Sequence, residues 1–227
     1  MAGTLYIIAT PIGNLEDITL RALRILKEVD LILAEDTRVT SKLLSHYEIV
    51  KPTLSYHQHS SDGVKLRILK ELVGGKNLAL VTDAGTPGIS DPGGELIDFL
   101  LEKEPSLKIV PIPGSAAVAA ALSICGFRAD KFVFTGFLPK KGKQNKLIEL
   151  NKLIEDGYGI VFYESPHRII KTLETLSAVL GKDRRVFLAR ELTKLHESLY
   201  RGPIEEVIAK IGKDKVKGEV VVVVEGK

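Results

Sequence analysis

Two alternating patterns of apolar positions run along this chain. Short runs rich in Val, Ile and Leu are typical of buried strands, and stretches with an apolar residue every three or four positions predict amphipathic helices. The predicted strands are 4–10, 31–34, 78–82, 107–112, 131–134, 159–163, 185–189 and 219–225. The predicted helices are 18–29, 64–73, 95–102, 115–124, 143–156, 166–180 and 203–211, with Asp17 or Thr19 as the cap of the first.

This alternation of strands and helices predicts an α/β fold with two domains and largely parallel sheets. The tract 110–115 holds two prolines and a glycine between a strand and an alanine-rich helix, so we place the domains at 1–112 and 113–227. The sequence shows no repeat and no low-complexity linker, so we expect closely packed halves with a ligand cleft between them. The unbroken valine run in 219–225 favours a strand buried at the centre of the second sheet.

Composition narrows the class of protein. No apolar run approaches the roughly 18 residues of a membrane-spanning helix. The first residues enter a strand pattern without a basic segment, so we expect no signal peptide. The single cysteine, Cys125, lies among apolar residues and is expected to be a core residue rather than a nucleophile. A cytoplasmic protein is therefore expected.

Charge is distributed unevenly along the chain. The net charge is +3, yet residues 137–217 alone carry 17 Lys and Arg against 11 Asp and Glu. Five lysines between 140 and 152 face only one acid, Glu149. Such a stretch could attract a polyanion such as RNA, although solvated lysines on a helix would give the same pattern.

Polar residues cluster where the predicted strands end. In open α/β sheets ligands bind at the carboxyl ends of the strands, so these loops are the candidate site. The loop 82–94 contains four glycines and two prolines, which suits a ligand held by backbone groups. The six loops are 9–14, 34–38, 82–94, 113–117, 163–168 and 189–194.

The chain lacks the sequence motifs of several common enzyme chemistries. The chain has no G-x-G-x-x-G dinucleotide fingerprint, no phosphate loop ending in Gly-Lys-Ser/Thr and no G-x-S-x-G elbow. His57 and His59 stand two residues apart without an evident third ligand, so no metal site is expected. A neutral or cationic ligand fits these loops better than a triphosphate.

Seven blocks of this sequence are similar to those of a known family. They include Ala-Glu-Asp-Thr-Arg at 34–38, Asp-Ala-Gly-Thr-Pro-Gly at 83–88 and Tyr-Glu-Ser-Pro-His-Arg at 163–168. The full set is 3–23, 30–38, 83–93, 111–114, 136–139, 163–168 and 190–197. Together they span essentially the whole chain and resemble the bacterial 16S rRNA (cytidine-2′-O)-methyltransferases that modify C1402, within the tetrapyrrole methylase superfamily.

This resemblance implies a cofactor and an assembly. Members of the superfamily use S-adenosylmethionine in a cleft between two α/β domains and are usually homodimers. A carboxylate and backbone carbonyls suit the positive sulfonium, and small residues let the backbone approach the ligand. The positions implied to bind the cofactor are Pro11, Asp83, Ala84, Gly85, Ile89, Ala116, Ala117, Tyr163, Glu164 and Ala189.

The implied reaction moves a methyl group to a ribose 2′-oxygen of 16S rRNA in the small ribosomal subunit. The hydroxyl is a weak nucleophile, so a base or a directing cation should help to remove its proton. The candidates are Glu35, Asp36, Arg38, Glu164, His167, Arg168, Arg190, Glu191, Lys194 and Glu197, of which we favour Lys194 and Glu191 as catalytic. Phosphate and RNA contacts are assigned to Arg38, Arg168, Lys140, Lys141 and Lys143.

Two other functions remain open at this level. A methyltransferase acting on carbon atoms of a tetrapyrrole precursor would share the fold and the methyl donor. A non-catalytic RNA-binding or ribosome-assembly protein could retain a vestigial pocket. Cofactor binding together with turnover on RNA would separate the three.

Overall fold

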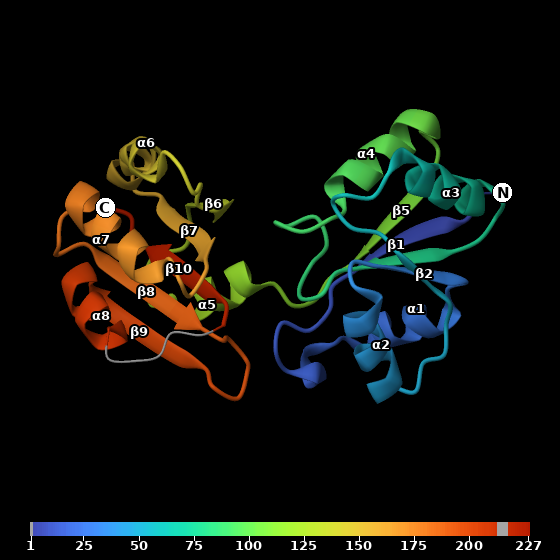
Figure 1. The fold of residues 1–227 in the computed structure, drawn as a ribbon, viewed down its shortest axis with the longest axis horizontal. Helices are drawn as coiled ribbons and strands as arrows, with labels where there is room; N and C mark the ends of the chain where they lie inside the picture. The colour runs from blue at the N-terminus through green and yellow to red at the C-terminus, as the bar shows by residue number, and fades with distance from the viewer. Residues whose placement is uncertain (1, 213–217) are drawn as a thin grey trace. The chain divides into compact units, whose positions relative to one another are not determined.

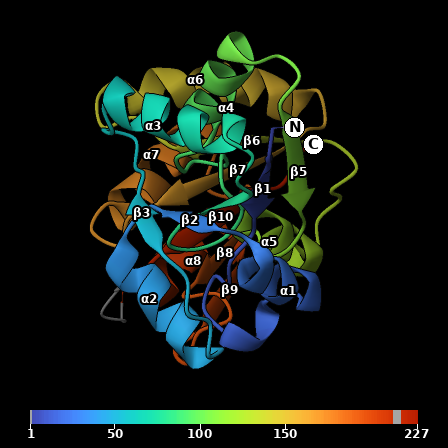
Figure 2. The ribbon, with the colours of Figure 1, turned by 90° about the vertical axis from the view of Figure 1, so that its right-hand side faces the viewer.

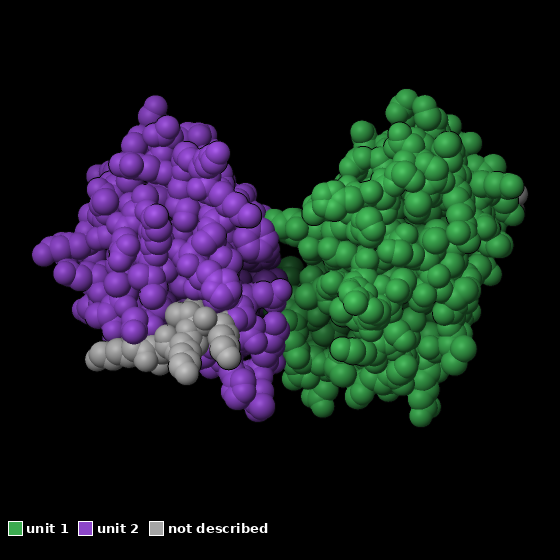
Figure 3. Space-filling model, in the orientation of Figure 1, with its two compact units in different colours: residues 1–116 green, residues 117–227 purple. Residues whose placement is uncertain are grey.

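The computed structural model describes residues 2–212 and 218–227. The chain forms two compact units, residues 1–116 and 117–227 (Figure 3). The division falls four residues beyond the boundary that we predicted. No helix among the described residues is long and apolar enough to cross a membrane.

The first unit is built on a five-stranded sheet in the order β3-β2-β4-β1-β5. Every pairing in it is parallel, as the sequence predicts. β4 is buried along its whole length because helices cover both faces of the sheet. The strands are β1 (Thr4–Ile8), β2 (Leu31–Ala34), β3 (Thr53–Ser55), β4 (Leu78–Val81) and β5 (Lys108–Ile112).

Four α-helices cover this sheet, two on each face (Figure 2). α1 (Leu20–Glu28) and α2 (Thr37–His46) form one hydrophobic core with it, and α3 (Asp62–Val73) and α4 (Gly94–Lys103) form the other. A 3₁₀ turn, η1 (Leu15–Asp17), precedes α1. Of the two expected caps, Thr19 is the one that begins α1: its hydroxyl accepts a hydrogen bond from the Ala22 amide at 3.1 Å.

The second unit corrects the prediction of a largely parallel sheet. The order of its described strands is β6-β7-β10-β8-β9, and among them only β6 and β7 are parallel neighbours. β10 runs antiparallel between β7 and β8, and β9 is antiparallel to β8. The central, fully buried position expected for the valine run is confirmed. The strands are β6 (Phe132–Phe137), β7 (Gly159–Glu164), β8 (Arg185–Arg190), β9 (Ser198–Pro203) and β10 (Val220–Val224).

Helices again cover both faces of this sheet (Figure 1). α6 (Lys143–Glu155), α7 (Ile169–Leu180) and α8 (Ile204–Ile211) share one hydrophobic core with Val220, Val222 and Val224. α5 (Ala117–Cys125) packs against β10 from the other side, and Cys125 is fully buried in it, as expected.

Four elements of the described residues were not predicted from the sequence: η1, α2, β3 and β9. Strand β3 has only three residues and exposes two of them, so it has no apolar run. Strand β9 contains Gly202 and Pro203, which are rare within strands, and pairs on one side only, at the edge of its sheet.

Candidate functional site

The carboxyl ends of the five parallel strands bring four predicted loops to one edge of the first unit. Thr10 and Gly85 exchange two backbone hydrogen bonds, at 2.9 and 3.1 Å, which join the loops after β1 and β4. The Thr86 hydroxyl donates to the Ser115 carbonyl at 3.0 Å, which joins the loops after β4 and β5. The three loops are therefore held together as a single backbone surface.

Glycine is required at two points of this surface. Gly85 has φ +90°, a conformation that side chains disfavour. At Gly114 an added Cβ would lie 2.9 Å from the Ala9 Cβ, so a side chain there would separate the loops after β1 and β5. The two glycines therefore let the loops after β1, β4 and β5 pack closely against one another.

Acidic side chains connect the loops after β2 and β4. The Asp83 amide donates to Glu35 Oε2 at 3.2 Å, and the Asp36 amide donates to Asp83 Oδ1 at 3.1 Å. Burial raises the pKa of Glu35 above its usual value. Hydrogen bonds from the Arg38 side chain and amide lower the pKa of Asp36 to about 2, so Asp36 is ionised at neutral pH.

The predicted cofactor positions of the first unit lie along this edge. Asp83 and Ile89 are exposed, Pro11, Ala84 and Ala116 are half-buried, and Gly85 is buried. Ala117 is the first residue of α5, at the start of the second unit. Arg38 lies in the same region. Its side chain pairs with Asp36 and is 87% exposed.

In the second unit the strand directions also create one polar edge. The last residues of β6, β7 and β8 lie beside the first residue of β10. Phe137 pairs with Tyr163, and Val220 pairs with Glu164 on one side and Arg190 on the other. Tyr163 is half-buried beside Glu164, whereas Ala189 is fully buried inside β8. Ala189 pairs with β10 on one side and with β9 on the other and is 0% exposed, so neither its side chain nor its main chain is open to a ligand.

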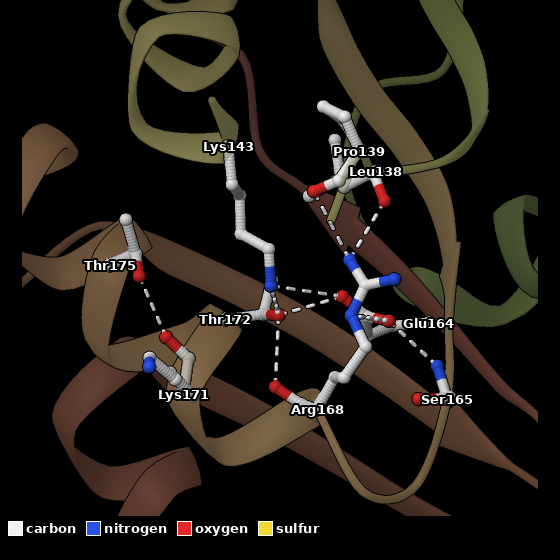
Figure 4. Close-up of polar contacts among 9 residues, drawn as sticks. All are labelled: Leu138, Pro139, Lys143, Glu164, Ser165, Arg168, Lys171, Thr172 and Thr175. Atoms are coloured by element: carbon white, nitrogen blue, oxygen red, sulfur yellow. Dashed lines mark hydrogen bonds and ion pairs between the residues drawn. The ribbon is translucent and has the colours of Figure 1, made fainter. Parts of the chain in front are cut away.

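Glu164 lies at the centre of a buried ion-pair cluster (Figure 4). Its side chain is fully buried, with Lys143 Nζ 3.3 Å from Oε2 and Arg168 Nε 3.2 Å from Oε1. The Thr172 hydroxyl donates to Oε2 at 2.7 Å, and the Ser165 amide donates to Oε1 at 2.8 Å. Both carboxylate oxygens are thus fully used within the unit.

This cluster corrects three residue assignments. Lys143 and Arg168 were expected to contact RNA, but their charged groups turn inward to Glu164, and their side chains are only 13% and 25% exposed. Arg168 Nη2 also donates to the carbonyls of Leu138 and Pro139, at 2.7 and 3.3 Å (Figure 4). Glu164 was expected to touch the cofactor, but its carboxylate is engaged within the unit and the whole residue is only 1% exposed.

The two favoured catalytic residues are in direct contact. Lys194 Nζ lies 3.0 Å from Glu191 Oε1 and 3.0 Å from Glu219 Oε2. Burial alone would lower the pKa of Lys194, but its hydrogen bonds to both carboxylates raise it above the usual value. Burial opposes ionisation of Glu191 as well, yet the Lys194 ammonium and the Glu219 amide lower its pKa on balance. The sequence reading missed Glu219, which it had placed inside a strand.

Lys194 is therefore a positioned cation and not a base at neutral pH. It lies in a loop of unusual backbone, in which Glu191 and Thr193 have φ of 52° and 65°. Positive φ is rare for a β-branched residue such as Thr193 and marks local strain. Among the described residues no group of three or more His, Cys, Asp or Glu could hold a metal ion.

Comparison with known proteins gives matches over nearly the whole chain. Residues 4–208 match the tetrapyrrole (corrin/porphyrin) methylases. The chain is 47% identical to ribosomal RNA small subunit methyltransferase I of Thermotoga maritima, over 99% of both chains. It is also 47% identical to the protein of that name from Synechocystis sp., over 99% of this chain and 79% of that one. The solved structure of cobalt precorrin-4 methyltransferase superposes with a TM-score of 0.73 at 18% identity, covering 98% of this chain and 94% of that one.

Proposed function

The chain belongs to the tetrapyrrole methylase family and, within it, groups with the small-subunit ribosomal RNA methyltransferases I, and from this membership we propose that it methylates the 2′-oxygen of C1402 in 16S rRNA. The observation that carries the proposal is the 47% identity over 99% of both chains. The fold alone would not choose a substrate, because a corrinoid methyltransferase shares it.

The first unit's strand-end surface fits S-adenosylmethionine as the methyl donor. When bound, this cofactor supplies a methyl group activated by a positively charged sulfonium. The exposed Asp83 carboxylate and the narrow backbone surface at Gly85 and Gly114 suit a cationic ligand recognised through main-chain groups. The residues proposed to hold it are Pro11, Asp83, Ala84, Gly85, Ile89, Ala116 and Ala117, with Tyr163 proposed from the second unit.

Lys194 and Glu191 are proposed to act on the ribose hydroxyl as a pair. The ammonium of Lys194 has three N–H donors, and Glu191 and Glu219 accept from it. A further hydrogen bond from this cation to the 2′-oxygen would stabilise the negative charge that develops as the hydroxyl gives its proton to solvent water and its oxygen takes the methyl group. Glu191 holds the ammonium in place and keeps it protonated.

The proposed substrate is the small ribosomal subunit, bound in the cytoplasm by a homodimer of this chain. Arg38, Lys140 and Lys141 are the proposed phosphate contacts, since all three are exposed. Replacing Lys140 and Lys141 by Glu should weaken RNA binding more at low salt than at high salt and leave cofactor affinity unchanged. Equal loss at all salt concentrations would remove both lysines from the RNA interface.

The experiment that tests the function compares methyl transfer to four substrates. Small subunits that lack the modification, free 16S rRNA, fully modified subunits and a tetrapyrrole precursor are each incubated with the chain and methyl-labelled cofactor. Label only in unmodified subunits supports the proposal. Label in a tetrapyrrole precursor but in none of the RNAs would assign the chain to the other branch of its family. Cofactor binding without transfer to any substrate would contradict an enzymatic role.

A further inference from the structure

One exposed aromatic side chain of the second unit is not used by the function described above. Phe137 ends β6, an edge strand, and is 57% exposed. Its ring lies 5.6 Å from that of Tyr163, and the Phe134 ring lies 4.9 Å from Tyr163 on the same strand pair. We call these three rings the aromatic platform. Phe137 is its most exposed member, so the platform presents one ring to solvent at the edge of the sheet.

The segment that follows Phe137 is held in place by contacts with the rest of the second unit. The Leu138 side chain is buried, and the Leu138 and Pro139 carbonyls both accept hydrogen bonds from Arg168 Nη2. Arg168 is held in turn by Glu164, as Figure 4 shows. The ion-pair cluster therefore positions the segment that follows the platform, which lowers the entropy cost of binding a ligand there.

Two exposed lysines follow this segment directly in the sequence. Lys140 and Lys141 are exposed, and within the described part of the chain no hydrogen bond or ion pair engages them. An aromatic ring for stacking beside cations for phosphate is the combination that binds single-stranded nucleic acid. The methyl donor does not explain it, because S-adenosylmethionine carries a net positive charge, which lysines repel.

We propose that Phe137 stacks on an unpaired base of the RNA substrate while Lys140 and Lys141 contact the adjoining phosphates. This inference rests on the proposed function, because it names the surface by which the second unit holds its RNA. Stacking makes Phe137 a binding residue whose contribution depends on its ring and not on salt.

The test compares Phe137→Ala and Phe137→Trp with Phe132→Ala. Phe132 is the matched control, since it is 44% exposed at the opposite end of the same strand. The affinity of each variant for unmodified small subunits is measured at several salt concentrations. Phe137→Ala should bind about 5- to 150-fold more weakly, the loss expected for one stacked base of about 1–3 kcal/mol. That factor should not change with salt, and Phe137→Trp and Phe132→Ala should bind like the wild type.

Two further measurements make the inference refutable. Calorimetric titration with S-adenosylmethionine should give the same affinity for all variants, and sedimentation should give the same oligomeric state. Unchanged subunit binding by Phe137→Ala would overturn the inference, and so would a loss of cofactor affinity or of self-association. If the wild type itself neither binds nor methylates subunits, the proposed function fails instead, and the two failures are thereby distinguished.

Discussion

Replacing Glu164 by Gln should destabilise the second unit strongly and leave the first unit unchanged. The substitution preserves the shape of the side chain but removes the carboxylate that Lys143 and Arg168 both face. Breaking a buried ion pair from one side costs about 3–5 kcal/mol. Because Arg168 is 25% exposed and a Gln oxygen still accepts from Ser165, we expect the lower end, about 3 kcal/mol.

Hydrogen exchange followed by mass spectrometry measures this loss in each unit separately. Peptides from β7 and β10 should exchange on the order of 100-fold faster, since each 1.36 kcal/mol is a factor of ten. Peptides from β4 serve as the internal reference. The matched control is Glu149→Gln, which breaks an exposed pair of 3.0 Å with Lys146 and should cost less than about 1 kcal/mol. Similar effects of the two variants, or faster exchange in β4, would refute this view of the cluster.

Three other substitutions test the site. Asp83→Asn should weaken S-adenosylmethionine binding about tenfold by removing a charge, and an unaltered calorimetric titration would exclude Asp83 from the site. Lys194→Met should lower kcat on the order of 100-fold; it should also cost about 1 kcal/mol of stability below pH 10.5, a cost that vanishes as pH rises through the raised pKa of Lys194. Unfolding curves that converge already near pH 8 would contradict the pKa. Gly114→Ala should destabilise the chain by about 1–3 kcal/mol through its contact with Ala9, whereas Gly94→Ala, with open space around it, should not.

The sequence predicts most elements of this fold because their patterns are local. The strand at 31–34 and the start of the helix at 143 have the predicted bounds, and the valine run lies at the centre of its sheet. Helix α2 was missed because Asp36, its cap, stands in a block of charged residues that we interpreted only as a site. The residue types that cap helices also contact ligands, so the interpretation as a site led us to overlook the helix start.

The direction of strands in the second sheet could not be predicted in this way. Alternation of strand and helix favours parallel pairing, but β8 and β9 follow each other without a helix and pair as a hairpin. The insertion of β10 between β7 and β8 joins residues more than 25 positions apart, which no local pattern records.

The same limit applies to the site. The charges at 140–152 and 163–168 were visible, but not which of them neutralise one another. Lys143 reaches Glu164 across 21 positions, and Lys194 reaches Glu219 across 25. Long-range ion pairs therefore divided the predicted RNA-binding lysines into a half-buried, ion-paired one, Lys143, and the exposed pair Lys140 and Lys141.

The position and chemistry of the transferred methyl group decide the function most directly. Unmodified small subunits are incubated with the chain and S-adenosylmethionine, and nuclease fragments of their 16S rRNA are mapped by mass spectrometry. We expect one new methyl group, on the ribose of C1402, which makes the adjoining phosphodiester resistant to alkali. A methyl group on a base, on another nucleotide, or on no part of the RNA would contradict the assignment.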